Sequence, residues 1–90
     1  MGTAIVKLKI MPDSPTANLE EIKNAAEEII KPNTASTVRF EEEPIAFGLK
    51  AVIAQFTIDE SKEMDPIENK LRAIAHVNSC EVIDFRRAFG

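Results

Sequence analysis

Residues 37–59 read TVRFEEEPIAFGLKAVIAQFTID, with a proline and a glycine between two apolar stretches. In residues 37–43, Val38 and Phe40 fall on one face of an alternating pattern, which predicts a strand. Residues 49–59 predict a longer strand, although both of its faces are fairly apolar and the pattern leaves the buried face open. The segment therefore predicts two consecutive strands that meet at a short joint.

The joint, residues 44–51 (PIAFGLKA), contains one large apolar side chain, Phe47. Pro44 stiffens the base of such a turn, and Gly48 allows a sharp change of direction. A phenylalanine at the tip of a hairpin either folds back into the core or is exposed for another protein. The pattern alone leaves these two interpretations open.

Strand and helix signals flank this hairpin on both sides. Residues 3–11 (TAIVKLKIM) alternate between apolar and basic side chains, which predicts a half-buried strand. Asn18, with Glu21 three residues later, predicts a capped helix that Pro32 and Asn33 end. Its apolar side chains recur at helical spacing.

A second helix and a last strand complete the chain. Asp65 is expected as the helix cap and Pro66 in the first turn. The buried side of this helix is predicted from four apolar residues: Ile67, Leu71, Ile74 and Ala75. Residues 77–87 then predict a strand that contains Cys80.

This order of elements, βαββαβ, predicts an α+β fold of the ferredoxin-like α/β sandwich type. A four-stranded antiparallel sheet would carry both helices on one face, in a single domain that covers residues 1–90. Right-handed crossovers lead us to expect the first and last strands side by side in the middle of the sheet.

The composition bounds the function. The chain has 90 residues, a formal charge of −4 and one cysteine. It shows no membrane-spanning run, signal pattern or possible internal disulfide, so we expect a cytoplasmic protein and no membrane association. The negative charge argues against direct nucleic acid binding. The strand LKAVIAQF also lacks the aromatic pattern of RNA-recognition domains.

No motif for catalysis or cofactor binding stands out. His76 and Cys80 are four residues apart, but two ligands do not make a zinc site and no third group orients the histidine. The run 41–43 (EEE) lacks the spacing of a cation loop and is interpreted as a solvated strand edge. With three glycines in all, the chain has no phosphate-binding loop. We therefore expect no metal, no cofactor and no enzymatic activity.

Two features remain as candidates for binding a partner. One is the joint with Phe47, and the other is the adjacent basic pair Arg86 and Arg87 near the C-terminus. An aromatic side chain beside arginines is typical of a protein-binding hot spot. We expect these two features to lie on the same side of the fold.

Four stretches in this order resemble the guanine-nucleotide exchange domain of translation elongation factor 1-beta, most closely its short archaeal form. They are KIMPDSP (9–15), NLEEIK (18–23), EEEPIAFGLKA (41–51) and HVNSCEVIDFRR (76–87). The Pro-Ile-Ala-Phe-Gly part is the most specific, and the resemblance covers essentially the whole chain.

The resemblance implies a monomeric exchange factor for elongation factor 1-alpha that promotes GDP release and GTP loading. It implies partner contacts by six residues: Pro44, Ile45, Phe47, Gly48, Arg86 and Arg87. Phe47 would insert into the GTPase. A basic residue matched by Arg87 would approach the partner's magnesium site, and whether Arg86 or Arg87 does so stays open.

Two other functions use the same fold. A ferredoxin-like regulatory domain would bind a small ligand, and it predicts a buried Phe47. An acylphosphatase-type enzyme would need an arginine and an asparagine around a phosphate loop, and that loop is missing here.

Overall fold

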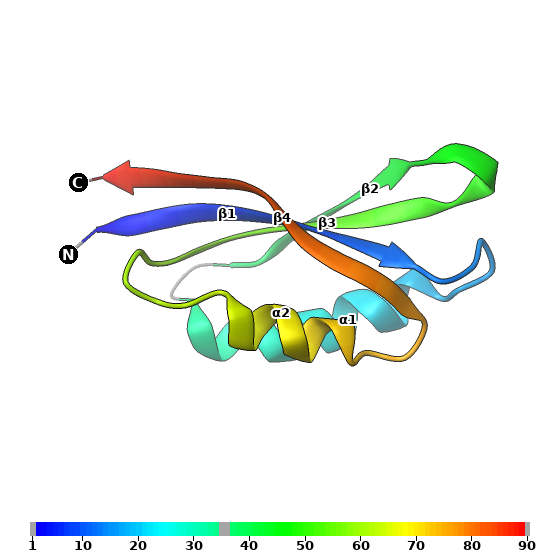
Figure 1. Ribbon diagram of the computed structural model, residues 1–90, viewed down its shortest axis with the longest axis horizontal. Helices are drawn as coiled ribbons and strands as arrows, with labels where there is room; N and C mark the ends of the chain where they lie inside the picture. The colour runs from blue at the N-terminus through cyan, green and yellow to red at the C-terminus, as the bar shows by residue number, and fades with distance from the viewer. Residues whose placement is uncertain (1, 35–36, 90) are drawn as a thin grey trace.

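The computed structural model describes residues 2–34 and 37–89, and it shows a four-stranded sheet with two helices (Figure 1). The elements in chain order are β1 (Thr3–Pro12), α1 (Leu19–Ile30), β2 (Arg39–Pro44), β3 (Lys50–Asp59), α2 (Asp65–Arg72) and β4 (Val77–Phe89). Two short 3₁₀ turns, η1 (Lys31–Asn33) and η2 (Ala46–Gly48), follow α1 and β2. The predicted ferredoxin-like α+β fold is confirmed.

The strands pair in the order β2-β3-β1-β4, and every neighbouring pair is antiparallel. The expectation that the first and last strands share the middle of the sheet is wrong in part. They are neighbours, but β4 is an edge strand and the middle is formed by β1 and β3. Each helical crossover passes over one strand, so β3 lies between β1 and β2, while β1 lies between β3 and β4.

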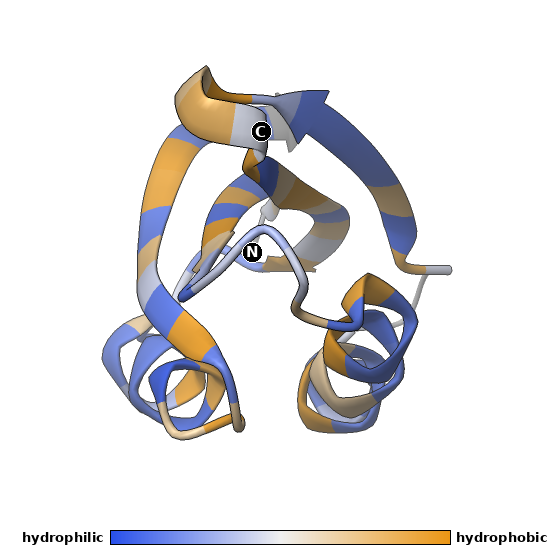
Figure 2. Ribbon diagram, turned by 90° about the vertical axis from the view of Figure 1, so that its right-hand side faces the viewer, coloured by the Kyte–Doolittle hydropathy of each residue, from blue (hydrophilic) through white to orange (hydrophobic). Residues whose placement is uncertain are grey.

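One face of the sheet is buried under both helices. Figure 2 looks along the long axis of the molecule and shows α1 and α2 side by side against this face. The core residues of the two central strands are Ala4, Val6, Leu8, Ile10, Val52, Ala54, Phe56 and Ile58. The helices contribute Ile22, Ala26, Ile30, Ile67 and Leu71. This arrangement places Val52, Ala54, Phe56 and Ile58 of β3 under the helices. Ala51 and Ile53, which alternate with them on the helix-free face, are also buried.

The helix starts follow their cap chemistry only partly. The side-chain oxygen of Asn18 accepts hydrogen bonds from the backbone N–H groups of Glu20 (3.0 Å) and Glu21 (3.2 Å), as a cap should. The prediction of Asp65 as the second cap is wrong. Met64 occupies that position without a side-chain cap bond, and Asp65 is the first helical residue. At this position the negative carboxylate of Asp65 still interacts favourably with the positive end of the helix.

The predicted buried side of α2 is correct for Ile67 and Leu71, whereas Ile74 is only partly buried. Ala75 is exposed, which contradicts the prediction. The reason is that α2 ends at Arg72 and Ala75 lies in the following turn. Among the described residues, no helix is long and apolar enough to cross a membrane.

The sheet runs along the longest dimension of a molecule that measures 41 × 21 × 20 Å. The β2–β3 hairpin projects at one end of this axis, and the two chain termini lie together at the other end (Figure 1). The register agrees, because Thr3 at the start of β1 pairs with both Asp59 and Phe89. The fold thus presents two separate ends.

Candidate functional site

The tip of the β2–β3 hairpin is a single 3₁₀ turn. The Ile45 N–H donates a hydrogen bond to the Leu49 carbonyl oxygen (2.7 Å), which closes the turn at its base. Two successive residues inside it have left-handed backbone angles, with φ of 63° at Phe47 and 77° at Gly48. Glycine adopts this conformation at little cost, but phenylalanine rarely does.

This backbone conformation leaves Phe47 95% exposed. Among the described residues, the other large apolar side chains counted as exposed are Ile83 and Phe85, each at only 46%. Because the ring has no packing partner and its residue has an unfavourable backbone angle, Phe47 does not stabilise the fold. Such strain in a loop is characteristic of functional sites, and the exposed ring is available to a partner.

The other predicted residues of this loop differ in exposure. Pro44 ends β2 and is exposed, Ile45 is half-buried, and Gly48 is exposed in the turn. A Cβ atom on Gly48 would be 3.9 Å from Pro15, which is ordinary contact, so Gly48 is required for its backbone angle rather than for space. The structure therefore brings all four loop residues together at one end of the molecule.

An ion pair braces the hairpin against α1. The Lys23 Nζ atom is 2.8 Å from Glu42 Oε2 in β2 and 3.4 Å from Glu20 Oε1. The hydrogen bond that Lys23 donates to Glu42 raises the pKa of Lys23 above its ordinary value, and the same bond lowers the pKa of Glu42. The pair links the strand that leads into the turn to the helix beneath it.

The predicted edge position of residues 41–43 is confirmed, since β2 is an outer strand and all three glutamates are exposed.

The C-terminal arginines lie on opposite faces of β4. Arg86 pairs with Ile5, whose neighbours Ala4 and Val6 point into the core, so Arg86 belongs to the helix-free face. Its Nε atom is 3.1 Å from Asp84 Oδ2, and the Arg86 side chain is 76% exposed. Arg87 pairs with Ala4 and therefore belongs to the helix-bearing face.

Arg87 is held by a residue that the sequence reasoning missed. Its Nε and Nη2 atoms donate hydrogen bonds to Glu60 Oε2 (2.7 Å) and Oε1 (3.2 Å). Twenty-seven residues separate the partners, so no local spacing points to the pair. Only the strand register, which places both Asp59 and Phe89 opposite Thr3, could have indicated it.

The expectation that Phe47 and the arginines lie on the same side of the fold is wrong. The hairpin precedes Lys50 at the start of β3, whereas Arg86 and Arg87 are near the end of β4. Because β3 and β4 are both antiparallel to β1, they run in the same direction, and the start of one lies far from the end of the other. The predicted site residues therefore form two groups at opposite ends of the long axis (Figure 1).

His76 and Cys80 have separate structural environments. His76 has a left-handed φ of 67° in the turn before β4, and its Nδ1 atom is 3.5 Å from Asp13 Oδ2. Cys80 belongs to the core, and burial raises the pKa of its thiol to about 11. Within residues 2–34 and 37–89, no group of three His, Cys, Asp or Glu side chains is placed to hold a metal ion.

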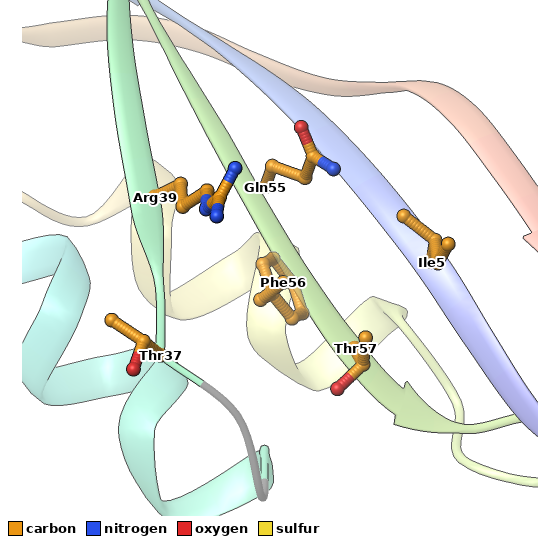
Figure 3. Close-up of a pocket in the computed structure, with 6 residues that line it drawn as sticks. All are labelled: Ile5, Thr37, Arg39, Gln55, Phe56 and Thr57. Atoms are coloured by element: carbon orange, nitrogen blue, oxygen red, sulfur yellow. The ribbon is translucent and has the colours of Figure 1, made fainter.

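A shallow hollow of about 270 Å³ lies where β2 meets the centre of the sheet (Figure 3). Its lining residues are Ile5, Thr37, Arg39, Gln55, Phe56 and Thr57. Arg39 and Gln55 are register partners across β2 and β3. The hollow is open to solvent and belongs to neither of the two predicted groups.

Comparison with known proteins extends over nearly the full length. Residues 5–88 match the family model described as EF-1 guanine nucleotide exchange domain. A relative from Methanobrevibacter smithii, named elongation factor 1-beta, is 41% identical over 88 residues, which cover 97% of this chain and 98% of the relative. Relatives of the same name from Methanococcus maripaludis (strain C6) and Methanocaldococcus jannaschii are 38% and 35% identical over 85 residues, or 93% of this chain and 96% of each relative.

Proposed function

The chain belongs to the EF-1 guanine nucleotide exchange domain family, and we propose that it promotes GDP release and GTP loading on elongation factor 1-alpha. The relatives named elongation factor 1-beta support this role in translation. In the proposal the chain is a cytoplasmic monomer that binds no nucleic acid directly and performs no substrate chemistry. The observation that carries the proposal is the 95% exposed ring of Phe47 on a strained turn.

Phe47 acts in this proposal as an anchor that enters an apolar pocket of the GTPase. Burial of one phenyl ring contributes roughly 1.5–3 kcal/mol. Because the ring is already exposed in the free protein, binding does not require it to leave the core. The braced base of the hairpin, where Pro44 and Ile45 lead into the turn, keeps the anchor in place.

The arginine end contacts a second part of the same partner in this proposal, near its nucleotide and magnesium ion. A positive charge placed there opposes the bound magnesium, with an interaction energy of a few kcal/mol at an effective dielectric constant of about 20. The long axis of 41 Å separates this end from Phe47, so the two groups act on different regions of the GTPase.

Exchange then follows from binding energy alone. The factor favours a conformation of the GTPase that holds GDP and magnesium badly, and by linkage GDP weakens binding of the factor to the same degree. A thousandfold faster release requires a barrier lower by about 4 kcal/mol. The anchor and the positive charge together supply energy of that order.

The small-ligand alternative expects Phe47 in the core, and the exposed ring contradicts that expectation. The exchange proposal is tested by release of a fluorescent GDP analogue from archaeal elongation factor 1-alpha. The native chain should accelerate release, and Phe47→Ala should lose most of the acceleration while staying folded. An unchanged release rate with the native chain would overturn the proposal.

A further inference from the structure

We propose that Glu60 is a positioning residue for nucleotide exchange, which holds Arg87 so that Arg86 is the arginine presented to the partner. The inference rests on the proposed exchange function and deepens it. It assigns different roles to two adjacent arginines that the sequence alone does not distinguish, and it adds Glu60, in the turn after β3, to the residues that exchange needs.

The first observation is the two-point contact between Glu60 and Arg87. Both carboxylate oxygens accept a hydrogen bond from the guanidinium group, at 2.7 and 3.2 Å. Paired parallel bonds of this kind fix orientation as well as distance. The Glu60 side chain is only 27% exposed, so the acceptor itself has limited freedom. Arg87 is thereby tied to the turn after β3.

The second observation is that the start of the chain makes room for this carboxylate. The Glu60 N–H donates a hydrogen bond to the Gly2 carbonyl oxygen at 3.0 Å. A Cβ atom on Gly2 would lie 2.7 Å from the Glu60 carboxylate, closer than such contacts allow. The Glu60 backbone therefore contacts the segment before β1, while its side chain contacts the end of β4.

The third observation is the different state of Arg86. Among the described residues, its polar side-chain contact is through Nε to the Asp84 carboxylate, two residues earlier in the same strand, at 3.1–3.2 Å. Within the described part of the chain, its two terminal nitrogens have no hydrogen-bond partner. They can bind a carboxylate or phosphate oxygen of the GTPase in the planar geometry that arginine favours.

These observations combine through the geometry of a strand. Successive side chains point to opposite faces, so a strand that directs Arg87 to the helix-bearing face directs Arg86 to the helix-free face. Chain ends fray unless something ties them down. The contact of Glu60 with Arg87 adds a side-chain tie to the backbone pairing of β4 with β1. Its loss would let the end of β4 fray and leave the direction of Arg86 less well fixed.

The test measures GDP release from elongation factor 1-alpha over a range of factor concentrations. Glu60→Gln removes the negative charge of the carboxylate that holds Arg87. It should lower the maximal rate at saturating factor roughly threefold to tenfold, since misplacement of Arg86 lowers the rate. Arg86→Gln should lower it at least as much. The half-saturating concentration should change little with Glu60→Gln, because Phe47 still anchors the partner.

A charge exchange gives the sharpest comparison. Arg87→Glu alone should lower the maximal rate, and Glu60→Arg combined with Arg87→Glu should restore it to within about twofold of native, because the reversed pair again ties the strand. Glu68→Gln is the matched control. It removes one carboxylate that lies 3.9 Å from Arg72, away from both ends, and should leave exchange unchanged.

The outcomes separate this inference from the proposed function. A native chain that fails to accelerate release overturns both. If the native chain is active and Glu60→Gln is equally active, only the inference is overturned. The same holds if the charge exchange is as impaired as Arg87→Glu alone, since Arg87 would then contact the partner itself. Thermal unfolding of each variant distinguishes loss of position from loss of fold, and a variant that is folded yet slow supports the inference.

Discussion

Phe47 and Arg87 lie at opposite ends of one sheet, the first at the tip of the β2–β3 hairpin and the second near the end of β4. Each end has its own support. The pair of Lys23 with Glu42 braces the hairpin, and the pair of Glu60 with Arg87 ties the far end. The sheet between them fixes the separation of the two ends, so the proposed mechanism requires a partner with two sites at a matching distance.

Replacement of Phe47 should separate stability from function. Phe47→Ala should leave the free energy of unfolding within about 0.5 kcal/mol of native, since an exposed ring has no core contacts to lose. Phe47→Gly should raise it by up to roughly 1 kcal/mol, because glycine tolerates the φ of 63°. Urea unfolding measures both values. A loss above about 1.5 kcal/mol in Phe47→Ala would show instead that the ring packs on the protein.

Gly48 should be sensitive through its backbone. Gly48→Ala should cost about 1–2 kcal/mol of unfolding free energy, because an alanine at a φ of 77° clashes with its own backbone. Gly48→Asn should cost less, since asparagine enters the left-handed region more readily. Calorimetry of the two variants tests the order. Equal stability of Gly48→Ala and native would mean that the turn has a different conformation in solution.

The brace between α1 and β2 should depend on pH in a defined sense. The Lys23 hydrogen bond lowers the pKa of Glu42, so this stabilisation is complete above the ordinary value of 4.5 and disappears as pH falls through the lowered value. The raised pKa of Lys23 keeps the pair intact below 10.5, and the stabilisation disappears above the raised value. Between these pH limits, Glu42→Gln should melt at a lower temperature than the native chain, and this deficit should not vary with pH.

In acid that deficit should vanish, because native Glu42 is then also neutral. Glu43→Gln is the matched control for this experiment. Glu43 lies next in the same strand and has no ion pair among the described residues, so its deficit should be small at every pH. A Glu42→Gln deficit that persists at pH 2 would show that packing, not charge, holds the brace.

Cys80 should report unfolding of the core. Only 3% of the residue is exposed, and burial raises the pKa of its thiol to about 11, so the reactive thiolate is scarce at neutral pH. Alkylation of the native protein at pH 7.5 should be slower than alkylation in urea by at least about a hundredfold. Rapid modification without denaturant would show that β4 opens locally around this residue.

Much of the fold could be predicted because the signals were local. The alternation in residues 3–11, the Asn18 cap and the apolar spacing of α1 each depend on residues a few positions apart, and each is confirmed. The hairpin joint was located for the same reason. The prediction of Asp65 as the cap was wrong by one position. Acidic side chains are favoured both at the cap and at the first helical residue, so the sequence does not distinguish the two.

The arrangement of the site could not be predicted, because it depends on strand order and register. The distance of Phe47 from the arginines follows from β4 lying at the edge beside β1, and no local pattern encodes that order. The Glu60 contact with Arg87 likewise needs the ends of β3 and β4 to meet beside Gly2. The exposure of Phe47 depends on its left-handed backbone, which a sequence pattern leaves open.

The most direct measurement is the rate of GDP release from elongation factor 1-alpha with the native chain, Phe47→Ala, Arg86→Gln and the double variant. The native chain should accelerate release, and Phe47→Ala should lower the second-order rate constant roughly tenfold or more, the equivalent of 1.5 kcal/mol or more. Because the two residues are far apart, the losses should multiply in the double variant. A native chain that leaves the release rate unchanged, or a double variant no worse than either single one, would contradict an exchange factor that acts through its two ends.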